Sequence, residues 1–451
     1  MQLEQPLTRP LFSFRALVHL IVPMMVEQAL AMMIGLADVV MISGVGEAAV
    51  SGVSLVDSIN NLMIQVLAAL SSGGAVVVAQ YLGRQNADDA REAANQLLVV
   101  VTLSSVTLTV LAMLTNGGLL RLLFGNIEPD VMHSARLYFY LSAASYPVLA
   151  VYNSIAGIFR AMGNSKVAMM TALFMNVVHI GCNSIMIYVF HWGVAGAGIA
   201  SLLSRTLSAY VMYRLIDSRH YPVWIELSKK WRYMPDMVRR ILNIGIPSGL
   251  ENGMFHIGRL MTLGIVAGFG TAAIAGNAIA SSISNMVMVP GSAIGLAMIT
   301  VVGQCMGAGE DGQAGKNVVR MMLMTYAAKV VLSAGLLLFA GRLVGLFGLE
   351  PAAAELARDL LYSLAIAQVL FWPTSFPLGH ALRATGDVRF TMIVSVVSMW
   401  AFRVVLSYVL AVQVGLGAIG VWYAMYIDWI ARTAAFLIRW RSGRWRSIRV
   451  I

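Results

Sequence analysis

Charged residues are scarce in this chain, and their scarcity excludes an ordinary soluble protein. Asp, Glu, Lys and Arg make up 12% of its 451 residues, whereas a soluble domain carries about 25%. Hydrophobic residues reach 59%, and the mean hydropathy is +0.77. Apolar stretches of about 20 residues recur along the whole chain, and a helix of that length crosses a bilayer. The composition therefore indicates a helical protein that crosses a membrane many times.

Cysteines and catalytic motifs are also nearly absent. Cys182 and Cys305 form neither a disulfide framework nor a metal-ligand spacing. The run "GLGAIG" (415–420) joins two apolar segments and lacks the preceding strand that a dinucleotide-binding loop requires. H-E-x-x-H, G-x-S-x-G and a complete phosphate-binding loop do not occur. We therefore predict no metal, no cofactor and no catalytic residue, and the energy for any transport must come from an ion gradient or from the substrate's own gradient.

The apolar segments predict twelve membrane-spanning helices, and the alternating pattern of transmembrane strands is missing. We place the helices near residues 14–41, 51–80, 93–115, 131–156, 166–190, 194–214, 241–266, 274–302, 317–341, 353–381, 389–412 and 416–438. The predicted fold class is an all-α polytopic membrane protein.

Lys and Arg gather in one set of the connections between these segments. They occur at 84–91, 160–166, 214–240, 316–320 and 383–389, and in the C-terminal tail. Because basic residues favour the cytoplasmic side, we expect both termini to be cytoplasmic, in the inner or plasma membrane of a bacterium. The formal net charge of +10 then fits contact with anionic lipid headgroups, and we expect no nucleic-acid partner.

The two halves of the chain repeat each other at an offset close to 224 residues. The matching stretches are "GVGEAAVSGVSLVDSINN" (44–61) with "GFGTAAIAGNAIASSISN" (268–285), "RAMGN" (160–164) with "RATGD" (383–387), and Pro23 and Glu27 with Pro247 and Glu251. Two homologous bundles of six helices are the simplest explanation. Because six is even, both bundles enter the membrane in the same direction, as in transporters built from parallel repeats.

This repeat predicts the domain organisation. We expect an N-lobe at 1–214, a cytoplasmic linker at 215–240, and a C-lobe with a basic tail at 241–451. Two such bundles enclose a central cleft, and a rocking motion between them would expose that cleft to alternate sides of the membrane.

The repeated motifs resemble the multidrug and toxic compound extrusion (MATE) family over nearly the whole chain. The motifs that carry the resemblance are "DVVMISGVGEAAVSG", "VGQCMGAG", the pair "RAMGN" and "RATGD", and "GVWYAMYIDWIAR". The resemblance implies twelve helices in two lobes around a V-shaped cavity. It also implies export of organic, often cationic, amphiphiles, driven by the inward movement of protons or sodium.

The resemblance also indicates a coupling site in the N-lobe. Asp38 resembles the acid that the family places on its first helix, and the motif positions add His179, Asn183 and Ser201. Many relatives have Asn in place of His179, and several have Asp in place of Asn183. Sodium prefers several oxygen ligands, whereas a histidine beside a buried acid suits proton transfer near neutral pH. His179 could equally serve only to hydrogen-bond a neighbouring helix.

Glu251 resembles the acid on the seventh helix of the family's sodium-coupled branch. That branch has a second acid on its tenth helix, roughly where this sequence has Phe371. We therefore expect Glu251 to be an isolated buried acid that carries a proton. Glu27 is its counterpart in the first half, and it could either take part in coupling or be held by a hydrogen bond near Pro23.

Two further groups of residues are expected inside the membrane. Asp428 and Arg432 lie one helical turn apart and should neutralise each other. Met32, Asn252 and Met254 are expected to line a substrate cavity, since thioether side chains adapt to varied shapes.

The sequence thus predicts an ion-coupled antiporter for organic, cationic or amphiphilic compounds, acting as a monomer among membrane lipids. Protons are favoured over sodium as the coupling ion. A flippase of lipid-linked precursors is the alternative, but it would favour extra helices and a positively charged groove. An intramembrane lipid enzyme would require a cluster of His, Asp or Ser near one interface, and the sequence shows none.

Overall fold

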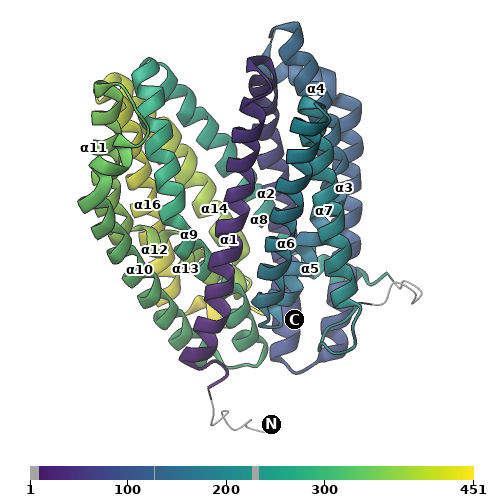
Figure 1. Ribbon diagram of the computed structural model, residues 1–451. Helices are drawn as coiled ribbons and strands as arrows, with labels where there is room; N and C mark the ends of the chain where they lie inside the picture. Colours follow the sequence, from purple (N-terminus) through teal and green to yellow (C-terminus); the bar gives the residue numbers. More distant parts are fainter. Residues whose placement is uncertain (1–9, 126, 226–232) are drawn as a thin grey trace, which may run out of the picture. The chain divides into compact units, whose positions relative to one another are not determined.

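The computed structural model describes residues 10–125, 127–225 and 233–451, and the regular secondary structure in these ranges is helical throughout (Figure 1). Each of the twelve predicted segments coincides with one helix or with a short run of helices. The all-α fold class is therefore confirmed.

The first half of the chain contributes six spans. They are α1 (Phe14–Ser43), α2 (Glu47–Gly83), α3 (Ala87–Phe124), α4 (Pro129–Ala144) with α5 (Tyr146–Ala161), α6 (Ser165–Ser184) with the π-helical turn η1 (Ile185–Val189), and α7 (Gly193–Ile216). Local sequence explains their ends. Asn86, for example, accepts a hydrogen bond from the backbone N–H of Asp89 and so caps the start of α3.

The second half contributes six more spans and a short terminal turn. They are α8 (Pro235–Ala267), α9 (Thr271–Gly307), α10 (Asp311–Gly345), α11 (Pro351–Leu370) with α12 (Trp372–Ser375) and α13 (Pro377–Ala384), α14 (Val388–Ser398) with η2 (Met399–Val405), α15 (Leu406–Tyr408) and η3 (Val409–Gln413), α16 (Gly417–Arg441), and the 3-10 turn η4 (Arg444–Ser447).

The described helices account for twelve membrane spans. Eight are long and apolar enough to cross a membrane singly, and two bent pairs meet the same condition together. The remaining two, α8 with 33 residues and α16 with 25, also exceed the length of about 20 residues that a span needs. Large apolar side chains such as Leu114, Leu122 and Leu338 are exposed on the helix surfaces, where lipid covers them. The chain is a multi-pass membrane protein.

The two bent spans are the fourth of each half, and both bend at prolines. The axes of α4 and α5 meet at 43°, and those of α11 and the α12–α13 segment meet at 62°. Pro147 lies in the first turn of α5, while Pro373 and Pro377 lie in the first turns of α12 and α13. Proline cannot donate the hydrogen bond that would continue the preceding helix, so each span breaks there.

The repeat is visible in the backbone as well as in the sequence. Residues with positive φ recur in pairs that lie 223 or 224 positions apart. These pairs are Gly46 and Gly270, Gln85 and Gly309, Gly125 and Gly348, Gly163 and Gly386, His191 and Gly415, and Gly193 and Gly417. The π-helical turn η1 likewise recurs as η3. The connections between spans therefore have the same geometry in both halves, as expected of two homologous six-helix bundles.

The described chain forms two compact units. The N-unit comprises residues 18–249, and the C-unit comprises residues 250–450 together with the start of the chain up to Leu17. The division falls within α8, between Gly249 and Leu250. The predicted lobe boundaries at 214 and 241 remain a prediction, and residues 226–232 of the predicted linker lie outside the described residues.

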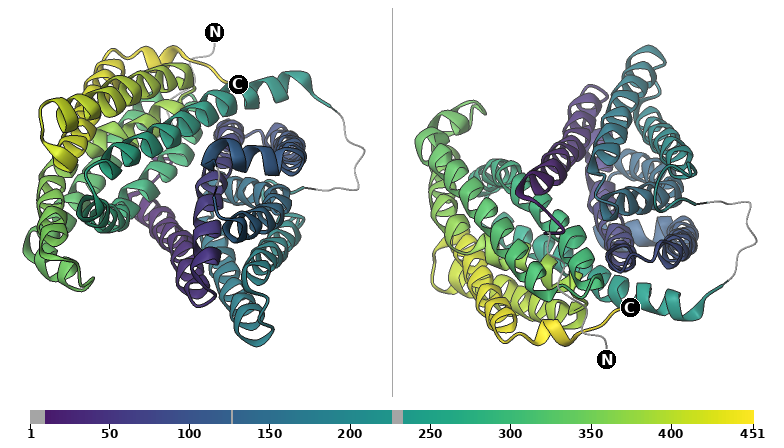
Figure 2. Two further views of the ribbon diagram at one scale, coloured as in Figure 1. Left: turned by 90° about the horizontal axis from the view of Figure 1, so that it is seen from above. Right: turned by 90° about the horizontal axis from the view of Figure 1, so that it is seen from below.

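One helix lies at the centre of each unit. In the N-unit, α2 packs against α3, α4 and α5, and the end-on views show these helices grouped together (Figure 2). A Cβ atom added to Gly73 of α2 would lie 2.7 Å from Gly245 of α8, so these two backbones meet without intervening side chains. In the C-unit, α9 packs against α10, α11 and α13, and the ring of Trp372 lies directly against Gly291.

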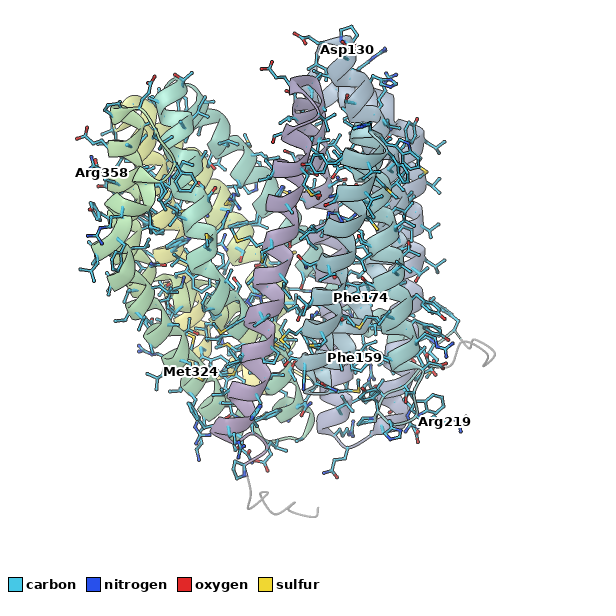
Figure 3. The ribbon with its side chains drawn as sticks, viewed as in Figure 1. Asp130, Phe159, Phe174, Arg219, Met324 and Arg358 are labelled. Atoms are coloured by element: carbon cyan, nitrogen blue, oxygen red, sulfur yellow. The ribbon has the colours of Figure 1, made fainter. Side chains whose placement is uncertain are left out.

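The two ends of the N-unit differ in charge. Figure 3 shows Asp130, at the start of α4, and Arg219, after α7, at opposite ends of this unit. The end with Arg219 also carries Arg84 in the α2–α3 connection and Lys166 in the first turn of α6. This asymmetry agrees with the charge pattern on which the predicted orientation rests, although the orientation itself stays a prediction.

Candidate functional site

Three of the predicted coupling residues meet inside the N-unit. Oδ1 of Asp38 lies 2.7 Å from Nε2 of His179 and accepts a hydrogen bond of 2.7 Å from Nδ2 of Asn183. Asp38 is 8% exposed, His179 2% and Asn183 0%. His179 and Asn183 are one turn apart on α6, so both side chains can reach Asp38 on α1. The acid therefore has polar partners within the span, as a buried carboxylate requires.

The contacts of His179 suit both of its protonation states. Its Nδ1 lies 3.1 Å from the hydroxyl of Ser204, which lies 3.1 Å from the backbone carbonyl of Ser201. When the ring is neutral with its proton on Nε2, Ser204 donates to Nδ1. When the ring is charged, both nitrogens donate, and Ser204 donates to the carbonyl. The ring therefore keeps a hydrogen-bond partner at each nitrogen in either state.

Ser204, which the sequence did not single out, is the serine that contacts His179. Ser201 is buried beside the cluster and contributes its backbone carbonyl. Both serines lie on α7, nearly one turn apart, and the family motif places Ser201 in the site. The sequence cannot show which of the two hydroxyls reaches the imidazole, because that depends on the rotation of α7 against α6. The role of Ser201 in coupling stays a prediction.

A second acid lies close to the Asp38 cluster. Asp57 on α2 accepts a hydrogen bond of 3.4 Å from Asn60, and it also hydrogen-bonds Tyr138. The charges of Asp38 and Asp57 interact, and the guanidinium of Arg205 is near enough to offset them. The polar centre of the N-unit is therefore larger than the set that the sequence predicted.

Glu27 is held by an ion pair within the N-unit. Its Oε1 lies 2.5 Å from Nη1 of Arg160, and both side chains are largely buried. Arg160 is the first residue of the motif "RAMGN", at the end of α5. The partner of Glu27 is thus a charged side chain and not only a hydrogen-bonding group near Pro23.

Glu251 is not isolated, so that expectation is wrong. Its Oε2 lies 3.0 Å from Nη1 of Arg383, which is in the last turn of α13. The sequence comparison looked for an acid at Phe371, whereas that residue follows α11 and packs against the apolar core of the C-unit. The neutralising charge comes from the motif "RATGD" instead.

These two ion pairs occupy equivalent places in the repeat. Glu27 and Glu251 are 224 residues apart, and Arg160 and Arg383 are 223 residues apart. Each pair joins the first span of its half to the end of the bent fourth span. The sequence contained all four residues as repeated motifs, but only the structure shows that they meet.

The C-unit has a charged cluster of its own. Nε of Arg432 donates a 3.0 Å hydrogen bond to Oδ1 of Asp428, which confirms the predicted pair on α16. Nη1 of Arg403, in η2, lies 3.9 Å from the other oxygen of Asp428. The cluster therefore contains two guanidinium groups and one carboxylate.

The residues predicted to line a substrate cavity are partly buried. Met32 lies on α1, whereas Asn252 and Met254 lie on α8. Nothing in their surroundings tests contact with a substrate, so their role stays a prediction.

Comparison with known proteins identifies the family. The MatE family model matches residues 23–185 and 247–409, two stretches that begin at the same offset as the repeat. The chain belongs to the MATE family. The family that the motifs resemble is thus confirmed over both halves.

Relatives of this MATE chain align along almost its whole length. It is 26% identical, over 97% of its length, to a probable multidrug resistance protein NorM of Thermotoga maritima, 94% of which is covered. It is 24% identical to the uncharacterized transporter YisQ of Bacillus subtilis, with 97% of this chain and 96% of that protein aligned.

Solved structures show the same fold. An outward-facing multidrug resistance MATE family transporter superposes with a TM-score of 0.89 at 22% identity, covering 95% of this chain and 96% of that one. A MOP superfamily transporter from Pyrococcus furiosus, described by a reverse polarity of its binding pocket, gives 0.88 at 23% identity with 96% of each chain covered.

Proposed function

We propose that this MATE chain is an ion-coupled antiporter that exports organic, cationic or amphiphilic compounds by alternating access. The observation that carries the proposal is the buried contact of Asp38 with His179 and Asn183 in the N-unit. Relatives named as multidrug resistance proteins support the direction and the cargo class. We further propose that it acts as a monomer in a bacterial inner or plasma membrane, with both termini in the cytoplasm.

We propose protons rather than sodium as the coupling ion, on the contacts of Asp38. The two groups nearest Oδ1 of Asp38 present nitrogen atoms, Nε2 of His179 and Nδ2 of Asn183. Sodium is a hard cation that prefers several oxygen ligands, whereas a proton needs only one acceptor. Binding of a proton to Asp38 would weaken its attraction for both neighbours, which gives the two protonation states different preferred conformations.

Glu27 and Glu251 are proposed to contribute to coupling through their ion pairs. Each carboxylate is stabilised in its charged form by an arginine on another span. A conformational change that separates the pair would leave a buried acid without its partner, and that acid would then favour protonation. The two pairs would thus link proton uptake to movement in each unit.

Flux into proteoliposomes tests the coupling ion. A fluorescent organic cation should accumulate under an imposed proton gradient at fixed sodium, and not under a sodium gradient at fixed pH. Asp38→Asn should remove the proton-driven component, whereas the matched Asp130→Asn change at an exposed site should retain it. Accumulation driven by sodium alone, and lost in Asp38→Asn, would replace protons with sodium in the mechanism.

Labelling of single cysteines tests the orientation. Thiols placed at positions 85 and 309, which are equivalent in the repeat, should react only from the cytoplasmic side. Thiols placed at 46 and 270 should react only from outside. If the two members of a pair, 85 and 309 or 46 and 270, reacted from opposite sides, the two halves could not enter the membrane in the same direction.

An intramembrane enzyme is a weaker candidate, although the structure gives it one observation. Asp38, His179 and Ser204 are arranged in the order of a catalytic triad, a cluster that the sequence did not reveal. Ser204 is only 1% exposed and lies in the middle of α7, away from either end of the span. A nucleophile must reach its substrate, so the arrangement favours proton transfer. Turnover of membrane lipid without any ion gradient would support the enzyme.

A lipid flippase is the second transport candidate. It would need positive charge for a phosphate headgroup, and the sequence suggested that such charge is lacking. The observation in its favour is that basic side chains outnumber acids within the spans of the C-unit. Flux of a labelled anionic lipid between leaflets distinguishes this candidate from export of a water-soluble compound.

A further inference from the structure

The spans of the C-unit contain an excess of positive charge. Apart from the Glu251–Arg383 pair, their described middle sections hold four basic side chains, which are Arg259, Lys329, Arg403 and Arg432, and one acid, Asp428. Charged groups in a membrane span are costly unless they face a partner or water. The partners of each basic group therefore decide what the cluster can do.

Arg432 is held by three hydrogen-bond acceptors. Its Nε donates to Oδ1 of Asp428 and to the hydroxyl of Ser398, and its Nη2 donates to the carbonyl of Ser395. Asp428 and Arg432 are both deeply buried. This pair is structural, and it uses most of the negative charge that the cluster offers.

Lys329 is satisfied by neutral groups. Its Nζ donates to the carbonyl of Val287 at 3.0 Å and to Oε1 of Gln368 at 3.2 Å, and it lies 4.1 Å from the ring centroid of Trp372. These contacts hold the amine in place, and no acid is among the partners that the described structure gives it. Lys329 therefore needs no acid ligand, and the arginines are the remaining candidates to bind one.

Arg403 is only partly neutralised. Its Nη1 is 3.9 Å from Oδ2 of Asp428, which is too far for a hydrogen bond. That oxygen is buried and has no hydrogen-bond partner in the described structure. The guanidinium donates to Sδ of Met425 at 3.1 Å, a weak acceptor, and its side chain is 12% exposed. It thus has donor groups left for a stronger acceptor.

Arg259 has still fewer partners. It lies one helical turn after Phe255 on α8, and the ring of Phe255 contacts the guanidinium of Arg403. Within the described residues, no hydrogen bond or ion pair holds the Arg259 side chain, which is exposed although α8 spans the membrane. Two like charges in a span repel each other unless an anion lies between them. The guanidinium of Arg259 therefore needs water or an acid group from outside the protein as its partner.

Aromatic rings surround these cations. The ring centroid of Phe255 lies 5.1 Å from Cζ of both Arg403 and Arg432. Phe376 meets Phe255 edge to face at 6.1 Å and meets Trp429 at 6.2 Å in the same manner. A ligand that reached Arg403 would therefore meet flat apolar surfaces beside the positive charge.

We propose that the C-unit binds aromatic acids, with the carboxylate or sulfonate held by Arg403 and Arg259 and the ring placed against Phe255 and Phe376. A planar acid group can accept two parallel hydrogen bonds from one guanidinium, which no contact of Arg403 in the described structure supplies. The proposal rests on the proposed transport function, because it names a class of cargo for that function. The proposal adds acidic aromatic compounds to the cationic cargo named above.

Equilibrium binding to purified protein in nanodiscs of zwitterionic lipid tests the site without any gradient. The probes are 2-naphthoate and its neutral methyl ester, measured by calorimetry. Arg403→Gln should weaken naphthoate binding about 10-fold to 100-fold, as expected for lost charge-assisted hydrogen bonds, and leave ester binding unchanged. Arg358→Gln, at an exposed site on α11 of the same unit, is the matched control and should bind both probes normally. An equal loss of both probes in Arg403→Gln would show apolar binding only and overturn the proposal.

Two further measurements separate the remaining outcomes. Asp428→Asn removes the carboxylate that competes with the ligand, so naphthoate should bind more tightly, a gain that partial unfolding cannot produce. Unchanged or weaker binding in a folded Asp428→Asn protein would contradict the placement near Arg403. Displacement of naphthoate by nanodiscs that contain phosphatidylglycerol would assign the site to a lipid headgroup instead. These experiments measure binding and need no transport. Absence of gradient-driven export would contradict the proposed function but would leave the binding result intact.

Discussion

Equivalent positions in the two units carry different chemistry on the same backbone. At the repeat offset of 224, Asp38, His179, Asn183 and Ser204 of the N-unit correspond to Thr262, Arg403, Ser407 and Asp428 of the C-unit. The acid has moved from the first span of its half to the last. The imidazole of the N-unit thus corresponds to a guanidinium in the C-unit.

What the halves keep is as informative as what they change. The Glu27–Arg160 and Glu251–Arg383 ion pairs are retained, and so are the positive-φ turns. The shared features fix the framework, whereas the polar centres differ in sign and in their ability to release a proton. In the proposed function, the N-unit exchanges protons and the C-unit holds a positive charge.

The largest expected effect is a difference in proton-driven export between variants of Asp38 in the N-unit and Asp428 in the C-unit. Asp38→Asn should reduce proton-driven export to the level of protein-free vesicles, because it removes the proton-binding group. Asp428→Asn should leave export dependent on the proton gradient, because this acid is occupied by Arg432 and Arg403. Vesicle flux measured under a pH gradient checks both variants. Loss of proton dependence in Asp428→Asn, with Asp38→Asn active, would reverse the assignment of the two units.

A smaller and equal effect is expected at the two ion pairs. Glu27→Gln and Glu251→Gln should each lower the free energy of unfolding by about 3 kcal/mol, since each leaves a buried guanidinium without its partner. Thermal unfolding in detergent measures the change, and Glu355→Gln on the surface of α11 serves as the control. Exchanging the charges in Glu251→Arg with Arg383→Glu should restore part of the loss. Strongly unequal effects of the two Gln variants would contradict the equivalence of the pairs.

The smallest effect distinguishes the two serines of α7. Ser204→Ala removes a hydrogen bond to His179 worth about 1 kcal/mol, which corresponds to about a fivefold slower proton-driven flux. Ser201→Ala keeps its backbone carbonyl and should have little effect. Rates measured under a pH gradient compare the two variants directly. A larger loss of flux in Ser201→Ala than in Ser204→Ala would assign the role to Ser201, the serine that the family motif indicates.

The spans were predictable because their signals are local. An apolar run of about 20 residues specifies a membrane helix wherever it occurs, and the turns between the runs repeat at one offset. The Asp428–Arg432 pair was predictable for the same reason, since one helical turn separates its members. The Asp38 cluster was found through motif positions, not through any local rule.

The remaining contacts depend on packing between distant segments. Glu27 and Arg160 are separated by 133 residues, and neither motif by itself predicts that their side chains are in contact. The isolated acid expected at Glu251 was wrong because the search considered only a replacement acid and not a basic partner. The rotation of α7 about its axis decides whether Ser204 or Ser201 faces His179. That rotation depends on the packing of side chains between α6 and α7.

The incompletely neutralised Arg403 has an electrical consequence. When one proton moves inward for each organic cation that leaves, the exchange transfers no net charge, and the membrane voltage does no work on it. When the outgoing cargo is a monovalent aromatic acid held by Arg403, the same exchange moves two positive charges inward. Each charge gains about 2.3 kcal/mol for every 100 mV of membrane potential. Under the two proposals, a guanidinium in place of an imidazole would therefore let the membrane voltage, as well as the pH gradient, drive export.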